Sequence, residues 1–244
     1  MARLPHRKYF LPLESNPAVF DQLMYELGVS SKLSFCDVLS IDAQEILKSI
    51  PRPVHAFVLV FPTSADYESL RLEKSIGKPA YDGSGEQEDV IWFKQTIGNA
   101  CGLYGLLHAV ANGKARCCIG ENTILGRLLK DCTSRAPDDR ALILENSSEL
   151  EAAHTSAAVK GDTAPPDNAE DEVDFHYVAF VRSLKNGHLY EMDGDNWGPF
   201  DLGVSLGDDE DLLTESVLEV VRAFIRRNEN DKGGFGLMAL VEGR

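Results

Sequence analysis

Residues 95–110 read QTIGNACGLYGLLHAV, and this segment is the most informative part of the 244-residue chain. After Cys101, apolar residues recur at intervals of three, four and seven, the pattern of a helix with one buried face: Leu103, Leu106, Leu107 and Val110. Cys101 therefore lies in the first turn of a predicted helix. At that position the positive end of the helix dipole favours the thiolate form of a cysteine, which is the nucleophilic form.

The residues around Cys101 suit attack on a carbonyl carbon. Gly98 and Gly102 remove side-chain bulk on both sides of the sulfur, and Gly98 or Asn99 can cap the helix. Attack creates a negatively charged oxygen, and each preorganised donor aimed at it is worth about 3–4 kcal/mol. The side-chain amide of Gln95 and the backbone N–H of Cys101 are the predicted donors.

The other four cysteines are expected to be inert thiols: Cys36, Cys117, Cys118 and Cys132. Five cysteines is an odd count, and their spacing fits neither a disulfide framework nor paired zinc ligands. The N-terminal residues also lack the apolar core of a signal peptide. We therefore expect no metal or organic cofactor and a reducing compartment, the cytoplasm or the nucleus.

A cysteine nucleophile needs a base, normally histidine, and the chain has six histidines. His108 follows Cys101 on the same helix face but about 10 Å along the axis, too far for direct proton transfer. Four others lie in a terminal segment expected to be mobile, in a polar tract, or in strand-like runs without an acid at useful spacing: His6, His154, His55 and His188. His176 is the remaining candidate.

His176 and Asp193 are carried by two predicted strands. The runs Phe175–Arg182 and His188–Gly194 are rich in strand-forming residues and are separated by a turn. They should therefore form a hairpin that ends in a carboxylate.

The length of the turn determines whether His176 and Asp193 meet. A two-residue turn at Asn186-Gly187 would leave Asp193 two pair positions away from the histidine. A four-residue loop, Leu184 to Gly187, instead pairs His176 with Asp195 and makes Asp193 its diagonal neighbour, about 7–8 Å away between backbones. We expect this longer loop, in which Asp193 can orient and stabilise the imidazole.

The sequence resembles the ubiquitin C-terminal hydrolase family of cysteine deubiquitinases. Residues 95–110 closely resemble the active-site segment of that family, and the likeness extends to residues 10–17, 51–54, 189–194 and 237–240. The resemblance covers essentially the whole chain. It implies that Gln95 is the oxyanion-hole residue, Cys101 the nucleophile, His176 the general base and acid, and Asp193 the orienting acid.

The residue patterns predict one domain, residues 1–244, with a central sheet between helices. The expected elements are helices at 17–27, 123–130, 137–145 and 212–227, strands at 34–39, 54–61 and 236–241, and a turn at Gly233-Gly234. The resemblance implies a mixed α/β (α+β) fold with the papain-like cysteine hydrolase architecture, in which a mostly antiparallel sheet is flanked by helices.

Residues 147–174 are rich in Ala, Ser, Thr, Asp and Glu, contain Pro165-Pro166 and show no apolar period. This composition predicts a mobile loop. The loop joins the half that carries Cys101 to His176, so its ends lie near the active site. In the resembled family the equivalent crossover loop arches over the cleft, where it would admit only small adducts, short peptides or unfolded tails.

The net charge of −15 disfavours a nucleic-acid partner and favours a basic peptide or tail. The longest apolar run, Val54 to Phe61, has the length of a strand, so no membrane span is expected. The resemblance supplies a partner, ubiquitin or its relative Nedd8, whose basic C-terminal tail acidic groups would bind. Glu14 and Asp37 are the candidates, because their segments resemble family stretches beside the tail.

These observations predict a monomeric thiol hydrolase acting at the C-terminal glycine of ubiquitin. One alternative is a protein that binds ubiquitin without turnover, which a misaligned triad would produce. Another is a general papain-like peptidase, since the order glutamine, cysteine, histidine, acid is shared with that class. The presence of all four predicted catalytic residues argues against a protein that only binds ubiquitin. The whole-chain resemblance argues against a general peptidase.

Overall fold

The computed structural model describes residues 6–77, 79–166, 168–171, 173–228 and 234–243. Six strands form its central sheet in the order β2-β8-β3-β5-β6-β7, and every neighbouring pair is antiparallel. Their bounds are Leu33–Asp37 (β2), Val54–Pro62 (β3), Phe175–Arg182 (β5), His188–Met192 (β6), Phe200–Ser205 (β7) and Gly236–Glu242 (β8). Two further short strands, Lys8–Tyr9 (β1) and Ile97–Gly98 (β4), pair in parallel.

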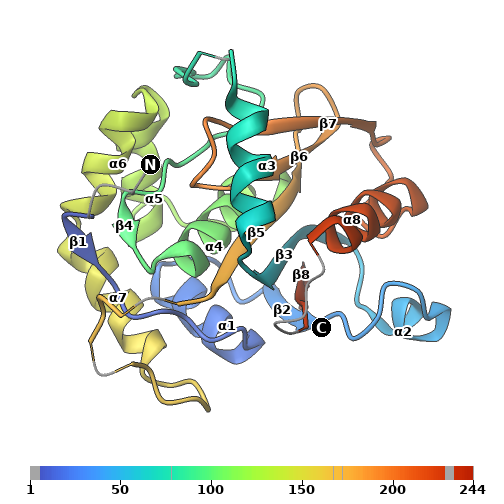
Figure 1. Ribbon diagram of the computed structural model, residues 1–244, viewed down its shortest axis with the longest axis horizontal. Helices are drawn as coiled ribbons and strands as arrows, with labels where there is room; N and C mark the ends of the chain where they lie inside the picture. Colours follow the sequence, from blue (N-terminus) through green and yellow to red (C-terminus); the bar gives the residue numbers. More distant parts are fainter. Residues whose placement is uncertain (1–5, 78, 167, 172, 229–233, 244) are drawn as a thin grey trace.

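Helices cover the sheet in two groups (Figure 1). Their bounds are Pro17–Glu26 (α1), Gln44–Ser49 (α2), Ala65–Ser75 (α3), Cys101–Ala111 (α4), Ile124–Thr133 (α5), Pro137–Glu145 (α6), Ser148–Ala158 (α7) and Glu215–Asn228 (α8), with a 3-10 helix at Gly113–Cys118. Helices α1, α4, α5 and α7 contribute to one hydrophobic core. Helix α8 and Tyr67 of α3 contribute to a second core. None of the helices described has the length and apolar content required to cross a membrane.

The strand β3 separates these two cores. Its alternate side chains enter opposite clusters: Ala56, Val58 and Val60 in the first, and Phe57, Leu59 and Phe61 in the second. Successive side chains of a strand point to opposite faces, so a strand covered on both faces reads as an unbroken apolar run. This burial explains why β3 has no polar alternation in the sequence.

The hairpin register agrees with the sequence prediction. Ala179 pairs with Met192 and Arg182 pairs with Leu189, which leaves Leu184 to Gly187 as the loop. Continued beyond its last paired residues, this register places His176 across from Asp195. The expected helices around residues 17–27, 123–130, 137–145 and 212–227 and the three other expected strands are also present, with ends shifted by a few residues.

The expectation of a mobile loop over residues 147–174 was wrong for its first part, which forms α7. Ser147 caps this helix by accepting a hydrogen bond from the Leu150 N–H at 3.2 Å. Leu150, His154 and Ala157 are buried at intervals of four and three residues, but alanine and histidine do not stand out as an apolar stripe. The segment without regular structure therefore begins after Ala158.

Several elements were not predicted. Helix α3 is rich in charged residues, α2 buries none of its residues, and β1 and β4 are only two residues long. Each of these elements depends on tertiary contacts more than on local pattern. The turn expected at Gly233-Gly234 lies partly outside the described residues, because Gly233 is not among them.

A buried ion pair fixes the segment that leads to residue 95. Arg140 of α6 pairs with Glu88, and their side chains are 0% and 6% exposed. The guanidinium also donates to the carbonyl oxygens of Cys132 at 3.0 Å and Trp92 at 3.1 Å. Arg140 thus joins α6 to the chain just before Gln95.

We expect Arg140→Met to lower the free energy of unfolding by about 3–5 kcal/mol, because Glu88 would keep a buried charge without its partner. Arg127→Met is the matched control, since Arg127 and its partner Glu149 are 48% and 60% exposed. It should cost less than about 1 kcal/mol. Urea denaturation measures both values, and equal losses would contradict a special role for the buried pair.

Candidate active site

Cys101 is the first residue of α4, as predicted from the apolar stripe. The prediction that Gly98 or Asn99 caps the helix was wrong, because the cap residue is Ala100 and no side chain bonds the first turn. Asn99 has a left-handed backbone, with φ of 57°. Its side chain instead donates to the carbonyl oxygens of Ala169 at 2.8 Å and Asp171 at 2.7 Å.

The N-terminal strand holds the backbone just before the nucleophile position. β1 pairs with β4, so that Tyr9 lies beside Gly98. A Cβ at Gly98 would lie 2.3 Å from the Tyr9 ring, so only glycine permits this contact. His6, expected in a mobile segment, bonds the Thr96 carbonyl oxygen through Nδ1 at 3.0 Å.

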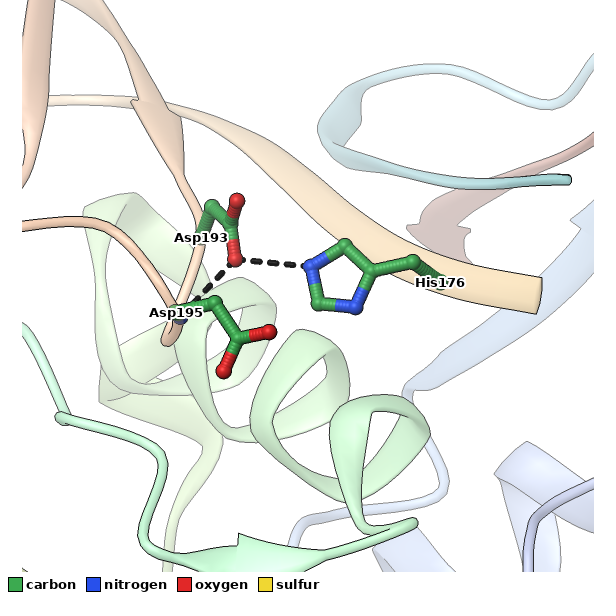
Figure 2. Close-up of side chains that lie close together, drawn as sticks. All are labelled: His176, Asp193 and Asp195. Atoms are coloured by element: carbon green, nitrogen blue, oxygen red, sulfur yellow. Dashed lines mark hydrogen bonds and ion pairs between the residues drawn. The ribbon is translucent and has the colours of Figure 1, made fainter. Parts of the chain in front are cut away.

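His176 and Asp193 lie in direct contact. The Nε2 atom of His176 is 2.8 Å from Oδ1 of Asp193, and the two residues are 5% and 0% exposed. Figure 2 shows the carboxylate facing the ring, with Asp195 beside it. The backbone N–H of Asp195 donates to the same Oδ1 at 2.9 Å. A carboxylate held in this way fixes the orientation of the imidazole.

The second ring nitrogen of His176 faces away from Asp193 (Figure 2). The side chain of Cys101 is one of the groups that raise the pKa of this imidazole. The Cys101 sulfur also lies 3.9 Å from the Phe175 carbonyl oxygen. Cys101, His176 and Gln95 line one cavity of about 480 Å³. The three side chains therefore face the same reaction space.

The charges of His176 and Asp193 are coupled. Burial would lower the pKa of His176, but the charge and hydrogen bond of Asp193 raise it well above 6.5. Burial would raise the pKa of Asp193, but the charge and hydrogen bond of His176 hold it below 3.8. At neutral pH the two side chains are therefore an imidazolium and a carboxylate.

Gln95 is joined to the loop that carries the acid. Its backbone N–H donates to the Gly194 carbonyl oxygen at 2.8 Å, and a Cβ on Gly194 would lie 2.8 Å from the Cβ of Gln95. The side-chain Nε2 donates to the Ile97 carbonyl oxygen at 3.3 Å, while Oε1 is buried with no partner among the described residues. The amide nitrogen has two hydrogens, so one remains to donate to an oxyanion in the cavity that Gln95 lines.

A second cavity of about 670 Å³ also reaches Cys101, and Glu14 is part of its wall. The carboxylate of Glu14 accepts a hydrogen bond from the Thr163 N–H at 2.8 Å. Asp37, the other predicted binding residue, is exposed at the end of β2 and lines neither cavity. The structure thus brings Glu14 to the site with Cys101 and leaves Asp37 outside it.

Comparison with known proteins matches this arrangement to one family. The profile of "Ubiquitin carboxyl-terminal hydrolase, family 1" matches residues 10–226. The chain belongs to this family. It is therefore a cysteine-type ubiquitin carboxyl-terminal hydrolase, as the resemblance of residues 95–110 predicts.

Curated members of the family are similar over most of their length. The chain is 35% identical to ubiquitin carboxyl-terminal hydrolase isozyme L1 of Equus caballus over 220 residues, 90% of this chain and 93% of the relative. It is 34% identical to ubiquitin carboxyl-terminal hydrolase 3 of Arabidopsis thaliana over 236 residues, 96% and 94% of the two chains.

A solved structure has the same fold. The UCH37 catalytic domain of Trichinella spiralis, bound to ubiquitin vinyl methyl ester, superposes with a TM-score of 0.72 at 23% identity and covers 98% of each chain. The predicted α/β fold, a mostly antiparallel sheet with flanking helices and papain-like architecture, is confirmed for this hydrolase.

The other histidines of the hydrolase have different surroundings. Burial lowers the pKa of His108 and of His154 to about 4, so both are neutral at pH 7. His108 accepts a hydrogen bond from the Phe93 N–H at 3.0 Å, so it packs, as expected. His188 does have an acid partner, Asp201 at 2.8 Å, but on the solvent-exposed side of the β6–β7 pair.

Two residues that contact Asp193 were not identified from the sequence. Tyr67 donates from its hydroxyl to Oδ2 of Asp193 at 2.6 Å, and Trp92 donates from Nε1 to the Asp193 carbonyl oxygen at 3.0 Å. Both come from segments without a recognisable motif. The two contacts with Asp193 become visible only in the folded structure, which places α3 and the segment after Glu88 beside this residue.

His176, Asp193 and Asp195 offer ligand atoms within 4.8 Å of one another, which is a spacing that also suits a metal ion. However, Nε2 of His176 and Oδ1 of Asp193 already share a hydrogen bond, and Oδ2 accepts from Tyr67. A metal would have to replace these bonds. The contacts fit a proton-handling pair better than a metal site.

We expect Asp193→Asn to lower the pKa of His176 below 6.5. The variant removes the charge that raises this pKa, whereas the burial that lowers it remains. An NMR titration of the histidine Cε1–H resonances measures the change. His154 is the internal reference, because its pKa of about 4 arises mainly from burial. Continued titration of His176 above 6.5 would show that Asp193 is not the source of the shift.

Proposed function

We propose that this chain removes small adducts or short peptides from the C-terminal glycine of ubiquitin, and thereby supports ubiquitin recycling and protein deubiquitination. One observation carries the proposal. Cys101, His176 and Gln95 line a single cavity while Asp193 holds the far side of the imidazole, in a chain that belongs to the ubiquitin carboxyl-terminal hydrolases.

Cys101 begins the reaction as a thiolate and attacks the carbonyl carbon of the last glycine of ubiquitin. The Gln95 amide and the Cys101 backbone N–H stabilise the oxygen that becomes negative. Imidazolium at His176 then gives its proton to the leaving amine or thiol, and the carbon–nitrogen or carbon–sulfur bond breaks. The product is a thioester between ubiquitin and Cys101.

Water completes the cycle. Neutral His176 takes a proton from the water molecule as it attacks the thioester carbonyl, and the sulfur of Cys101 leaves. Asp193 stabilises the imidazolium that forms and keeps the ring in one orientation. These steps use only side chains and backbone groups of the chain itself.

The two cavities beside Cys101 bind different parts of the substrate. The larger cavity has mainly apolar walls and includes the Glu14 carboxylate, which suits an extended tail that carries arginine. The smaller cavity, which contains His176, receives the leaving group. Asp37 lies outside both cavities, so we assign it to contacts with a more distant part of ubiquitin.

The segment between α7 and β5 limits the leaving group. Asn99 donates to the carbonyl oxygens of Ala169 and Asp171, and Glu14 accepts from the Thr163 N–H. These bonds hold the described part of the crossover loop across the entrance to Cys101. A folded domain attached to ubiquitin would not pass beneath it, whereas a short peptide would.

The remaining proposals concern the setting of the reaction. Five free cysteines support a reducing compartment, the cytoplasm or the nucleus. A monomeric state is expected, and Nedd8 is the second candidate substrate. The assay below, repeated with a Nedd8 amide, measures the preference between the two.

We expect the wild-type protein to release the fluorophore from ubiquitin that carries a C-terminal fluorogenic amide. A peptide containing only the ubiquitin tail should react much more slowly, because it lacks the folded body. Cys101→Ala should abolish turnover, because the nucleophile is absent. Cys117→Ala, which changes an exposed cysteine, should retain it.

Each other outcome supports an alternative. Binding of ubiquitin without release of the fluorophore would favour a ubiquitin-binding protein with a misaligned triad. Equal cleavage of the tail peptide would favour a general papain-like peptidase. Turnover that survives Cys101→Ala would remove Cys101 from the mechanism.

We expect Glu14→Gln to raise KM for the ubiquitin amide about 2- to 5-fold with little change in kcat, because one charge-assisted contact to the tail is weakened by about 0.5–1 kcal/mol. Glutamine keeps an oxygen that accepts from Thr163. Glu45→Gln is the control, since Glu45 is exposed on α2, where it pairs with Lys48. An unchanged KM would place Glu14 outside the binding surface.

A further inference from the structure

Tyr67 lies directly behind the acid of the site. Its hydroxyl donates to Oδ2 of Asp193 at 2.6 Å, and the residue is only 8% exposed. Its ring contacts Phe61 edge-on, with 4.8 Å between centroids, and lies 5.9 Å from the ring of His176. Tyr67 therefore contacts both members of the charged pair.

The two oxygens of Asp193 have different partners. Oδ1 accepts from His176 at 2.8 Å and from the Asp195 N–H at 2.9 Å, whereas Oδ2 accepts from Tyr67. A carboxylate with donors on only one oxygen can rotate about its terminal bond at little cost. The hydroxyl of Tyr67 opposes this rotation.

The helix that carries Tyr67 is itself well anchored. Only two residues separate it from β3, and Ser64 caps it by accepting a hydrogen bond from the Tyr67 N–H at 3.1 Å. One turn later, Arg71 donates to the carbonyl oxygen of Asp195. β3 pairs with β5 so that Phe61 lies opposite His176. The positions of Tyr67 and His176 are therefore set by adjacent strands.

We infer that Tyr67 is a positioning residue for the proposed hydrolysis: its hydroxyl holds the Asp193 carboxylate in the rotation that keeps Oδ1 aimed at His176. The inference rests on the proposed function only for its effect on turnover. Without the hydroxyl, Oδ2 becomes a buried acceptor without this donor, and the carboxylate can rotate away from the imidazole.

Four titratable groups act on His176: Cys101 from α4, Tyr67 from α3, and Asp193 and Asp195 from the loop after β6. Burial, and then the charge of Asp193, raises the pKa of Tyr67 well above 10. The hydroxyl therefore keeps its proton and donates throughout the pH range in which the protein would work.

Tyr67→Phe removes the hydroxyl and keeps the ring. We expect kcat for the ubiquitin amide to fall about 10-fold with KM unchanged, because a hydrogen bond to a charged group is lost on the side of the site that does not touch the substrate. Tyr190→Phe is the matched control. Tyr190 is 6% exposed and donates to Asp89 at 3.2 Å, away from the cavity with Cys101.

The same substitution in a second variant of the protein distinguishes a positioning role of Tyr67 from a purely structural role. In the Asp193→Asn variant, Tyr67→Phe should change kcat less than about 2-fold, because the group through which Tyr67 acts is already altered. An equal loss in both backgrounds, a rise in KM alone, or a kcat equal to that of wild type would overturn the inference. Tyr67→His, which retains a ring donor, should keep more activity than Tyr67→Phe and replaces it if that variant does not fold.

A measurement without substrate distinguishes this inference from the proposed function. Alkylation of Cys101 by iodoacetamide, followed by peptide mass spectrometry, reports how pH governs the sulfur and imidazole. Tyr67→Phe should move the rise in alkylation to higher pH, because a weaker bond to Asp193 stabilises the imidazolium, and with it the thiolate, less. A profile equal to that of wild type refutes positioning. Absence of ubiquitin turnover in wild type refutes only the proposed function.

Discussion

The hydrogen-bonded pair of His176 and Asp193 is the interaction on which the site depends. Asp193 is completely buried, and an uncompensated charge in such a place would cost several kcal/mol. It is compensated by donors from three separate parts of the chain: the imidazole on β5, the hydroxyl of Tyr67 on α3 and the backbone of Asp195. The folded chain must therefore bring all three parts together before the carboxylate can be buried as an ion.

The sheet provides the order that makes this possible. β3 and β6 lie on either side of β5, so the segments after β3 and after β6 meet near the start of β5, where His176 lies. Different elements position the nucleophile, Cys101. α4 packs against β5, and the residues just before Cys101 are held by the parallel pairing of β1 with β4. Both sets of elements therefore place their residues at the cavity that contains Cys101 and His176.

Much of this arrangement could be predicted from the sequence, because local patterns carried it. The apolar stripe after Cys101 marked α4, and the alternative turn lengths gave a register for β5 and β6 that the structure contains. The spacing also linked His176 with Asp193, and these two residues do bond. Where a pattern repeats along a helix or a strand, the structure of that element can be predicted from the sequence.

The failures have a common physical origin. Helix α7 buries alanines and a histidine, so its stripe has little hydrophobic contrast, and its stability comes from contact with α1. Tyr67 is one aromatic residue in a charged helix, and nothing local indicates that its hydroxyl reaches a carboxylate 126 positions away. The binding role predicted for Asp37 stays a prediction, because the position of this residue outside the two cavities is set by how β2 lies in the sheet.

The place of β8 in the sheet has a consequence for synthesis. This strand covers residues Gly236–Glu242 yet lies between β2 and β3, as the second of the six strands in the order. Ribosomes release a chain from its N-terminus, so β2 and β3 emerge long before the strand that must separate them. A nascent chain has to keep that gap open or leave its apolar strands unpaired, and the sheet closes only after residue 242 has left the exit tunnel. The six-stranded sheet is therefore complete only after its last strand in sequence has been synthesised.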